Sequence, residues 1–304
     1  MPKGGKPDKG GPGGGGGDGG DTGAADGSVI DLGALAAKKN FKTYNFHPET
    51  GVLVPYFDYR NQNGPAEDMV VLGSSGSEML YLDEANDTAT MGDGADWVVG
   101  NLGDDNISGE GDRDILIGDF DGGWSTYDIL GDDTLDGGEG DDVLWGDTYR
   151  TIANGTPPEG YPDVSGGNDS LIGGAGHDDI VGDSRTLDGV TGGDDTIIGG
   201  EGNDFMWGDA YELINEATGG ADVFVFEDGS NDDVIFDFEV GKDILDLTGW
   251  SGNFVLDPTY TEPAGEGEPD FTGTLITHTW GDPGAEQTDT IFLLDVSISE
   301  YLIA

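Results

Sequence analysis

Apolar residues recur once in every nine positions from Gly73 onward, and this period predicts the fold. Five nine-residue units run without a gap, GSSGSEMLY, LDEANDTAT, MGDGADWVV, GNLGDDNIS and GEGDRDILI, and the units GGEGDDVLW, GGAGHDDIV and GGEGNDFMW follow later. The first six positions are rich in glycine and usually end in aspartate, whereas the eighth is apolar. Such a unit can hold a six-residue turn and a three-residue strand, whose alternation points position eight inward. Two units would complete one coil, which predicts an all-β, right-handed parallel solenoid.

The eighth positions form the predicted core of this solenoid. They are Leu80, Ala89, Val98, Ile107, Leu116, Leu135, Leu144, Leu171, Ile180, Ile197, Met206, Phe224 and Ile235. All except Ala89 carry large apolar side chains, as a thin stacked core requires. Each coil would bury only two of them, which offsets little of the backbone entropy lost when eighteen residues are fixed. A second source of stability is therefore required.

Longer units alternate with short ones in the second half of the repeat region. Their sixth-position aspartates are Asp133, Asp169, Asp195 and Asp222. Each long unit opens with the same dipeptide, at Gly118-Asp119, Gly146-Asp147, Gly182-Asp183 and Gly208-Asp209. Because successive units fall on opposite edges of the solenoid, all four insertions are expected to leave from the same edge.

The charge of the chain limits what it can bind. The 304 residues include 63 acidic and 11 basic side chains, for a formal net charge of −52. This charge opposes compaction and makes nucleic acid or an anionic membrane an unsuitable partner. The absence of cysteine excludes disulfides and thiolate metal sites. No apolar run approaches the roughly 20 residues of a membrane span, and the N-terminus lacks the apolar core of a cleaved signal peptide.

The carboxylates therefore need cations that the chain does not supply, and calcium fits best. Ca²⁺ takes 6–8 oxygen ligands and accepts carboxylates together with main-chain carbonyls, whereas magnesium demands a tight octahedron and keeps its waters. An ion between stacked turns would join aspartates eighteen residues apart, as Asp87 to Asp105 and Asp96 to Asp114. One edge would continue through Asp133, Asp169, Asp195 and Asp222, and the other through Asp142, Asp178, Asp204 and Asp233. At the insertion mouths, Asp119, Asp147, Asp183 and Asp209 are expected to add calcium ligands, although carboxylates there could also cap turns.

Composition divides the chain into four predicted parts. Residues 1–28 are almost all Gly, Asp, Pro and Lys and are expected to be a disordered tail. Residues 29–72 are expected to form a β-rich lead-in that covers the first edge. Residues 73–236 would be the solenoid with four one-sided insertions, and residues 237–304 a β-rich C-terminal cap.

The repeat G-G-x-G-x-D-x-U-x closely resembles the calcium-binding repeat of RTX proteins, which forms the parallel β-roll of serralysin-type proteases. Residues 220–249, with their D-F-x-x-G-x-D-x-x-D-L run, resemble the segment that ends such rolls. The final TDTIFLLDVSISEYLIA resembles the strand and uncleaved signal recognised by type I secretion systems. The resemblance implies a bacterial protein that the type I machinery exports unfolded and that folds on extracellular calcium. The long insertions and the unit LDEANDTAT depart from the family pattern.

Catalytic motifs are weak in this chain. Serralysin-type proteins carry a zinc protease domain with an H-E-x-x-H motif, which is missing here. His47, His177 and His278 lie far apart, and each is expected to be a surface or turn residue and not a metal ligand. The GDS at residues 182–184 is similar to a lipase nucleophile motif, but Gly-Asp opens every insertion, so the repeat explains it better.

Two functions remain open from the sequence. The first is a secreted, non-catalytic calcium-binding protein whose insertions form an interaction or matrix surface for an extracellular polysaccharide or protein. The second is a carbohydrate-active or other hydrolytic enzyme whose site is built from the insertions. The lack of a separate catalytic domain of about 150 residues favours the first. The aromatic residues of the insertions are Phe120, Trp124, Tyr127, Tyr149, Tyr161 and Tyr211.

Overall fold

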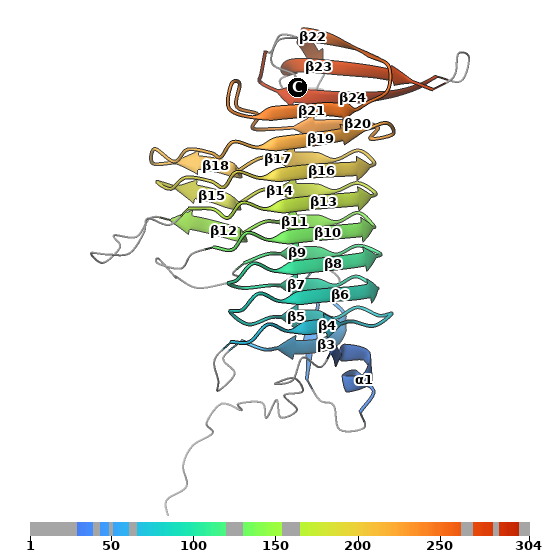
Figure 1. The fold of residues 1–304 in the computed structure, drawn as a ribbon, viewed down its shortest axis with the longest axis vertical. Coiled ribbons are helices and arrows are strands. Elements are labelled where there is room, and N and C mark those ends of the chain that lie inside the picture. The colour runs from blue at the N-terminus through green and yellow to red at the C-terminus, as the bar shows by residue number, and fades with distance from the viewer. Residues whose placement is uncertain are drawn as a thin grey trace, which may run out of the picture.

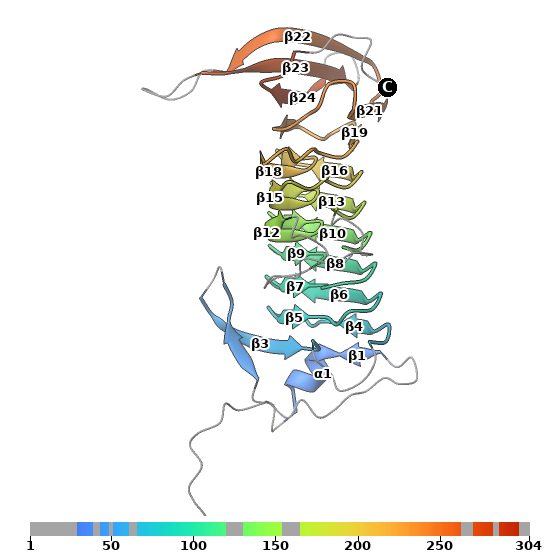
Figure 2. The ribbon, with the colours of Figure 1, turned by 90° about the vertical axis from the view of Figure 1, so that its left-hand side faces the viewer.

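The chain folds into two long parallel sheets that face each other. The computed structural model describes residues 29–38, 43–48, 51–60, 66–119, 130–153, 165–262, 270–281 and 286–297. Regular structure in these residues is almost entirely strand, apart from the short helix α1 (Leu32–Ala36). The prediction of an all-β parallel roll is confirmed, and Figures 1 and 2 show its coils stacked along one axis.

The chain passes from one sheet to the other and back in each coil. The nine-stranded sheet contains, in order, β1 (Ile30–Asp31), β4 (Val70–Leu72), β6 (Thr88–Asp93), β8 (Asn106–Gly111), β10 (Thr134–Glu139), β13 (Ser170–Ala175), β16 (Thr196–Glu201), β19 (Val223–Glu227) and β21 (Ile244–Gly249). The twelve-stranded sheet contains β2 (Tyr44–Phe46), β3 (Leu53–Asp58), β5 (Met79–Tyr81), β7 (Trp97–Val99), β9 (Ile115–Ile117), β11 (Val143–Trp145), β14 (Asp179–Val181), β17 (Phe205–Trp207), β20 (Asp232–Ile235), β24 (Gln287–Leu294), β23 (Phe271–Trp280) and β22 (Asn253–Glu262).

The core between the two sheets is a stack of single side chains, one from each strand. In the nine-stranded sheet, Leu135 lies beside Ile107 on one side and Leu171 on the other. In the twelve-stranded sheet, Leu144 lies beside Leu116 and Ile180 in the same way. All thirteen predicted eighth positions are at most 1% exposed. Strand register thus follows the nine-residue period directly.

Both sheets extend beyond residues 73–236. At the start, β1 pairs with β4, and β3 pairs in parallel with β5. At the other end, β21 pairs in parallel with β19, and β24 with β20. The segments expected to act as caps therefore supply further coils, and their antiparallel pairs, β2–β3, β22–β23 and β23–β24, lie at the ends of the twelve-stranded sheet.

Three of the four insertions lie side by side on one edge of the roll. Those that begin at Gly146, Gly182 and Gly208 contribute β12 (Thr148–Ala153), β15 (Ser184–Asp188) and β18 (Ala210–Ile214) to a three-stranded parallel sheet. We call this the insertion sheet, and Figure 1 shows it on the left of the coils. Most of the insertion that begins at Gly118 lies outside the described residues. So do Phe120, Trp124, Tyr127 and Tyr161, and the side chain of Tyr149.

No helix in the described part of the chain is long and apolar enough to cross a membrane.

Candidate metal centre

Sixth-position aspartates stack into one column on each edge of the roll. After the first aspartate of each column, the Oδ1 atom accepts a hydrogen bond from the main-chain N–H of the aspartate one coil earlier, at 2.7 Å from Asp105 to Asp133 and 2.8 Å from Asp142 to Asp178. The column on the insertion edge runs through Asp87, Asp105, Asp133, Asp169, Asp195, Asp222 and Asp243. The column on the smooth edge runs through Asp96, Asp114, Asp142, Asp178, Asp204 and Asp233.

In most of the predicted aspartates, one carboxylate oxygen has no hydrogen-bond partner among the described residues. All sixteen aspartates predicted from the sequence are at most 2% exposed. In fifteen of them, all except Asp87, one oxygen is buried without a hydrogen-bond partner among the described residues. A buried carboxylate is costly unless it is paired or binds a metal. Each of these oxygens therefore indicates a position that a cation could occupy.

Glycine carbonyls converge on the same oxygens. A Cβ atom built on Gly137 would lie 2.5 Å from Asp142 Oδ2 and 2.6 Å from the carbonyl oxygen of Gly173, one coil later. A Cβ atom on Gly199 would lie 2.5 Å from Asp204 Oδ2. Where a unit begins with glycine, that glycine thus keeps free a cradle lined by carboxylate and main-chain oxygens, which is the ligand set that calcium prefers.

Main-chain oxygens would make up most of each ligand shell. Among the described residues, no three acidic or histidine side chains converge on one point. Calcium accepts this arrangement because its 6–8 ligands can include carbonyls and water, with few carboxylates. The residues present therefore fit calcium.

The insertion edge carries a second carboxylate in each of four coils. Asp119 accepts a hydrogen bond from Gly131 N at 2.9 Å, and Asp183 from Gly193 N at 2.8 Å, in each case across the insertion. Asp147 and Asp209 bind Gly167 and Gly220 in the same way. The aspartate of each Gly-Asp dipeptide therefore ties together the two ends of its insertion. Its other oxygen is buried and unpartnered, so the turn-capping and metal-binding interpretations are compatible.

Burial raises the pKa values of the column carboxyls. The pKa rises to about 9 for Asp96 and about 8 for Asp178, where burial is the main cause and neighbouring carboxylates add to it. For Asp133 and Asp195, burial and the nearby carboxylates raise the pKa well above its usual range. Without a cation, the folded columns favour protonated carboxyls, because a proton removes the buried charge.

Two further aspartates extend the insertion-edge pattern and were not predicted. Asp237 accepts hydrogen bonds from Gly208 N at 2.8 Å and Asp209 N at 3.0 Å. Asp243 accepts one from Asp222 N at 3.1 Å. They occupy the second and sixth positions of one more unit, whose eighth-position Leu245 is fully buried. The spacing of Asp243 and Leu245 matches the sixth and eighth positions of a unit and could have indicated this unit in the sequence. The glycine pattern is interrupted there, so the unit was not recognised.

The expectation that every histidine is a surface or turn residue is wrong for His278, which lies inside β23, whereas His47 lies in the turn between β2 and β3. His47 is 1% exposed and His278 is fully buried. His278 stacks on Trp250 at 4.3 Å, and its ring nitrogens contact Ser251 O at 2.8 Å and Asp289 Oδ2 at 3.3 Å. Both histidines lie in the end segments, where the nine-residue period gives no guide to burial.

The GDS motif lacks the exposed serine that a nucleophile requires. Ser184 is fully buried at the start of β15, and its hydroxyl donates a hydrogen bond to the carbonyl of Thr186 at 3.1 Å. The motif occurs because the Gly-Asp dipeptide that begins an insertion is followed here by serine.

Stacked coils, glycine cradles and columns of unpaired carboxylates define a calcium-binding parallel β-roll. A family model, the RTX calcium-binding nonapeptide repeat, matches four stretches of the chain, residues 92–123, 130–148, 163–184 and 190–210. These stretches are RTX-type calcium-binding repeats, and repeats of this kind bind several Ca²⁺ ions along the roll. A search of curated proteins found no similar sequence.

Proposed function

We propose that this is a secreted, non-catalytic protein that folds when calcium fills its two aspartate columns and that presents the insertion sheet as an interaction surface. The calcium ligands would be the sixteen predicted aspartates together with glycine carbonyls of adjacent coils. Asp237 and Asp243 would complete the insertion-edge column.

The unpaired, buried carboxylate oxygens carry this proposal. Fifteen such oxygens lie inside a chain whose formal charge is −52, and no protein cation faces most of them. Lys242 and Arg113 are exceptions, since Lys242 lies close enough to Asp209, and Arg113 to Asp142, to lower the pKa of those carboxyls. An ion that binds only the folded coils adds its binding free energy to their stability. Bound calcium would thus replace the repulsion between neighbouring carboxylates with attraction to a shared ion that links adjacent coils.

Export explains why the fold would depend on calcium. RTX repeat proteins are typically secreted. We propose that residues 237–304 contain an uncleaved signal read by a type I system, although residues 298–304 lie outside the described part of the chain. Sites of roughly 10⁻⁴–10⁻³ M affinity, as in extracellular modules, would stay empty in the cytoplasm and fill outside. The chain would therefore be exported unfolded.

A calcium titration followed by circular dichroism tests this proposal. We expect a largely unfolded chain in excess chelator and a steep gain of β-structure on adding Ca²⁺. Mg²⁺ at the same concentration should give little change, because it resists losing its waters to an irregular oxygen site. A native-like spectrum in excess chelator, or an equal response to magnesium, would refute calcium-driven folding.

A further inference from the structure

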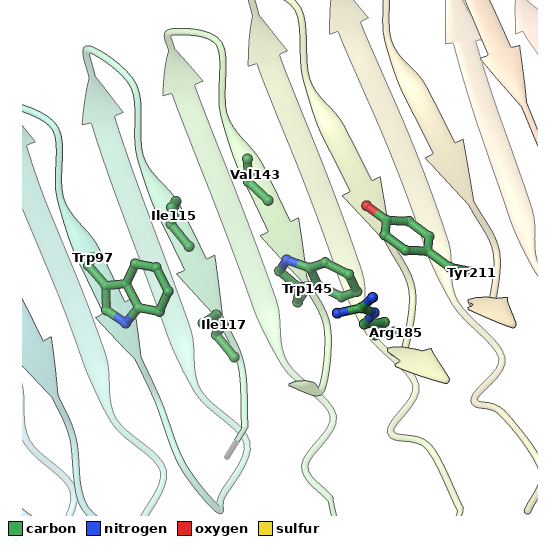
Figure 3. A pocket seen from close by; sticks show the side chains of 7 residues that line it. All are labelled: Trp97, Ile115, Ile117, Val143, Trp145, Arg185 and Tyr211. Carbon is green, nitrogen blue, oxygen red and sulfur yellow. The ribbon is translucent and has the colours of Figure 1, made fainter. Parts of the chain in front are cut away.

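A groove lies on the outer face of the twelve-stranded sheet, beside the insertion sheet. It has a volume of ≈ 310 Å³, and its floor is formed by apolar side chains of β7, β9 and β11, among them Trp97, Ile115 and Trp145. The insertion sheet supplies its rim, with Arg185 from β15 and Tyr211 from β18 (Figure 3). The groove therefore crosses the strands and follows the axis of the roll.

Aromatic rings continue along this axis beyond the groove. The ring of Tyr211 lies 5.1 Å from that of Trp145 and 4.4 Å from that of Trp207. Trp207 in turn stacks on Phe236 at 4.2 Å, with the two ring planes 5° apart. Trp145 and Trp207 lie two strands apart in the same register, each beside Val181, which places them about 10 Å apart along the axis at about 4.8 Å per strand. Trp97 lies in the row of Ile115 and Val143, two residues away along the strands. This spacing is close to the length of a disaccharide in an extended polysaccharide.

We infer that this aromatic groove binds an extended, neutral polysaccharide laid along the roll, a step that rests on the proposed role of the insertions as an interaction surface. The exposed ring of Tyr211 and the half-buried ring of Trp207 offer flat apolar surface to the C–H faces of sugar rings, with a polar edge for hydroxyls, while the buried Trp97 and Trp145 support them from below. Arg185 is exposed and forms no salt bridge with a described residue, so its guanidinium donors are available to hydroxyl oxygens.

Other occupants fit the groove less well. Its floor is a sheet face whose main-chain groups are already paired in parallel ladders. A peptide there would lose water from its own amides without gaining main-chain partners. The net charge of −52 disfavours a second copy, an anionic membrane or an acidic polysaccharide. A neutral glycan carries no charge to be repelled.

Binding of defined hexasaccharides to the calcium-loaded protein tests the inference. Tryptophan emission and isothermal titration should both detect cellohexaose, an extended neutral chain. Maltohexaose, which has the same sugar in a helical chain, should bind at least about tenfold more weakly. Polygalacturonate tests the acidic class. Failure of cellohexaose to bind at millimolar concentration, or binding of polygalacturonate alone, would overturn the inference.

Two substitutions locate the binding site. Tyr211→Ala and Arg185→Gln alter exposed side chains of the rim and should each weaken cellohexaose binding by about tenfold. Phe271→Ala is the matched control, because Phe271 is 50% exposed on β23 and does not line the groove. Equal affinity in all three variants would place the sugar elsewhere and refute the site.

Circular dichroism in calcium separates the two proposals. A chain that folds on calcium but binds no hexasaccharide would refute the glycan site and leave calcium-driven folding intact. A chain that does not fold on calcium would overturn both.

Discussion

Replacing Asp142 by asparagine isolates the charge of one column carboxylate. Asp142 Oδ1 accepts the N–H of Asp114 at 2.7 Å, and an asparagine oxygen can keep this bond. The buried, unpartnered Oδ2 becomes an amide group that faces the proposed calcium cradle. The substitution therefore removes a metal ligand with little change in shape.

The expected loss of stability is moderate in calcium and absent without it. Even loss of an outer-shell partner weakens metal binding by about 10–100-fold. This corresponds to about 1.4–2.7 kcal/mol of unfolding free energy in saturating calcium, because binding is linked to folding. In chelator, Asp142→Asn should be no less structured than the unaltered chain, since it removes a buried negative charge.

Urea unfolding at fixed calcium is the more sensitive assay. Eleven aspartate-to-aspartate hydrogen bonds span the two columns. With one calcium ion bound between each pair of successive aspartates, a weaker affinity at one site changes the average affinity only slightly. The calcium concentration at the folding midpoint should therefore rise only about 1.2- to 1.5-fold. The urea midpoint should fall by about 1 M, given slopes of about 1–3 kcal/mol per M.

The neighbouring residue provides the control. Asp141 is exposed, and its Oδ1 accepts the N–H of His177 at 3.0 Å, a bond that asparagine can keep. Asp141→Asn should change the unfolding free energy by less than about 0.5 kcal/mol. If the two variants have the same urea midpoint in calcium, Asp142 is not a calcium ligand.

Three further predictions follow from the cradles, the buried carboxyls and the C-terminal segment. Gly137→Ala places a methyl group 2.5 Å from Asp142 Oδ2 and should lower the free energy of unfolding in calcium by about 1–3 kcal/mol. Gly76→Ala is the control and should not change it, because no atom lies within 4 Å of the added Cβ. Equal losses in the two variants, measured by urea unfolding, would contradict the cradle. Because burial raises the pKa of Asp96 to about 9 and of Asp178 to about 8, the metal-free folded chain binds more protons than the unfolded chain, and its stability falls as pH rises from about 4 through about 9. Circular dichroism in chelator should therefore show more β-structure at pH 5.5 than at pH 8, and the opposite trend would show that the columns are not buried as described. Deleting residues 250–304 should keep the product inside the producing cell, and normal secretion of the truncated chain, measured in the culture medium, would exclude the proposed type I signal.

The nine-residue period by itself determined the coils, the strand register and the core. Each residue of a coil meets its counterpart in the next coil, so one spacing rule places Leu135 against Leu171 and Asp133 against Asp169. The rule survives the insertions because they open between the second and third positions of a unit, where Asp119 and its counterparts hold the two ends together. The column aspartates could thus be selected from the sequence.

Tertiary structure alone decided the features that break this period. The apolar period does not predict that β12, β15 and β18 form a sheet, although Thr148, Ser184 and Ala210 pair in the register of the coils. Nor does it predict the approach of Tyr211 to Trp145, whose separation follows no repeat. Burial of His278 and the place of Asp243 in the column depend on how the end segments close the sheets. Side-chain packing between irregular segments depends on their three-dimensional path, which a local pattern of apolar and polar residues does not specify.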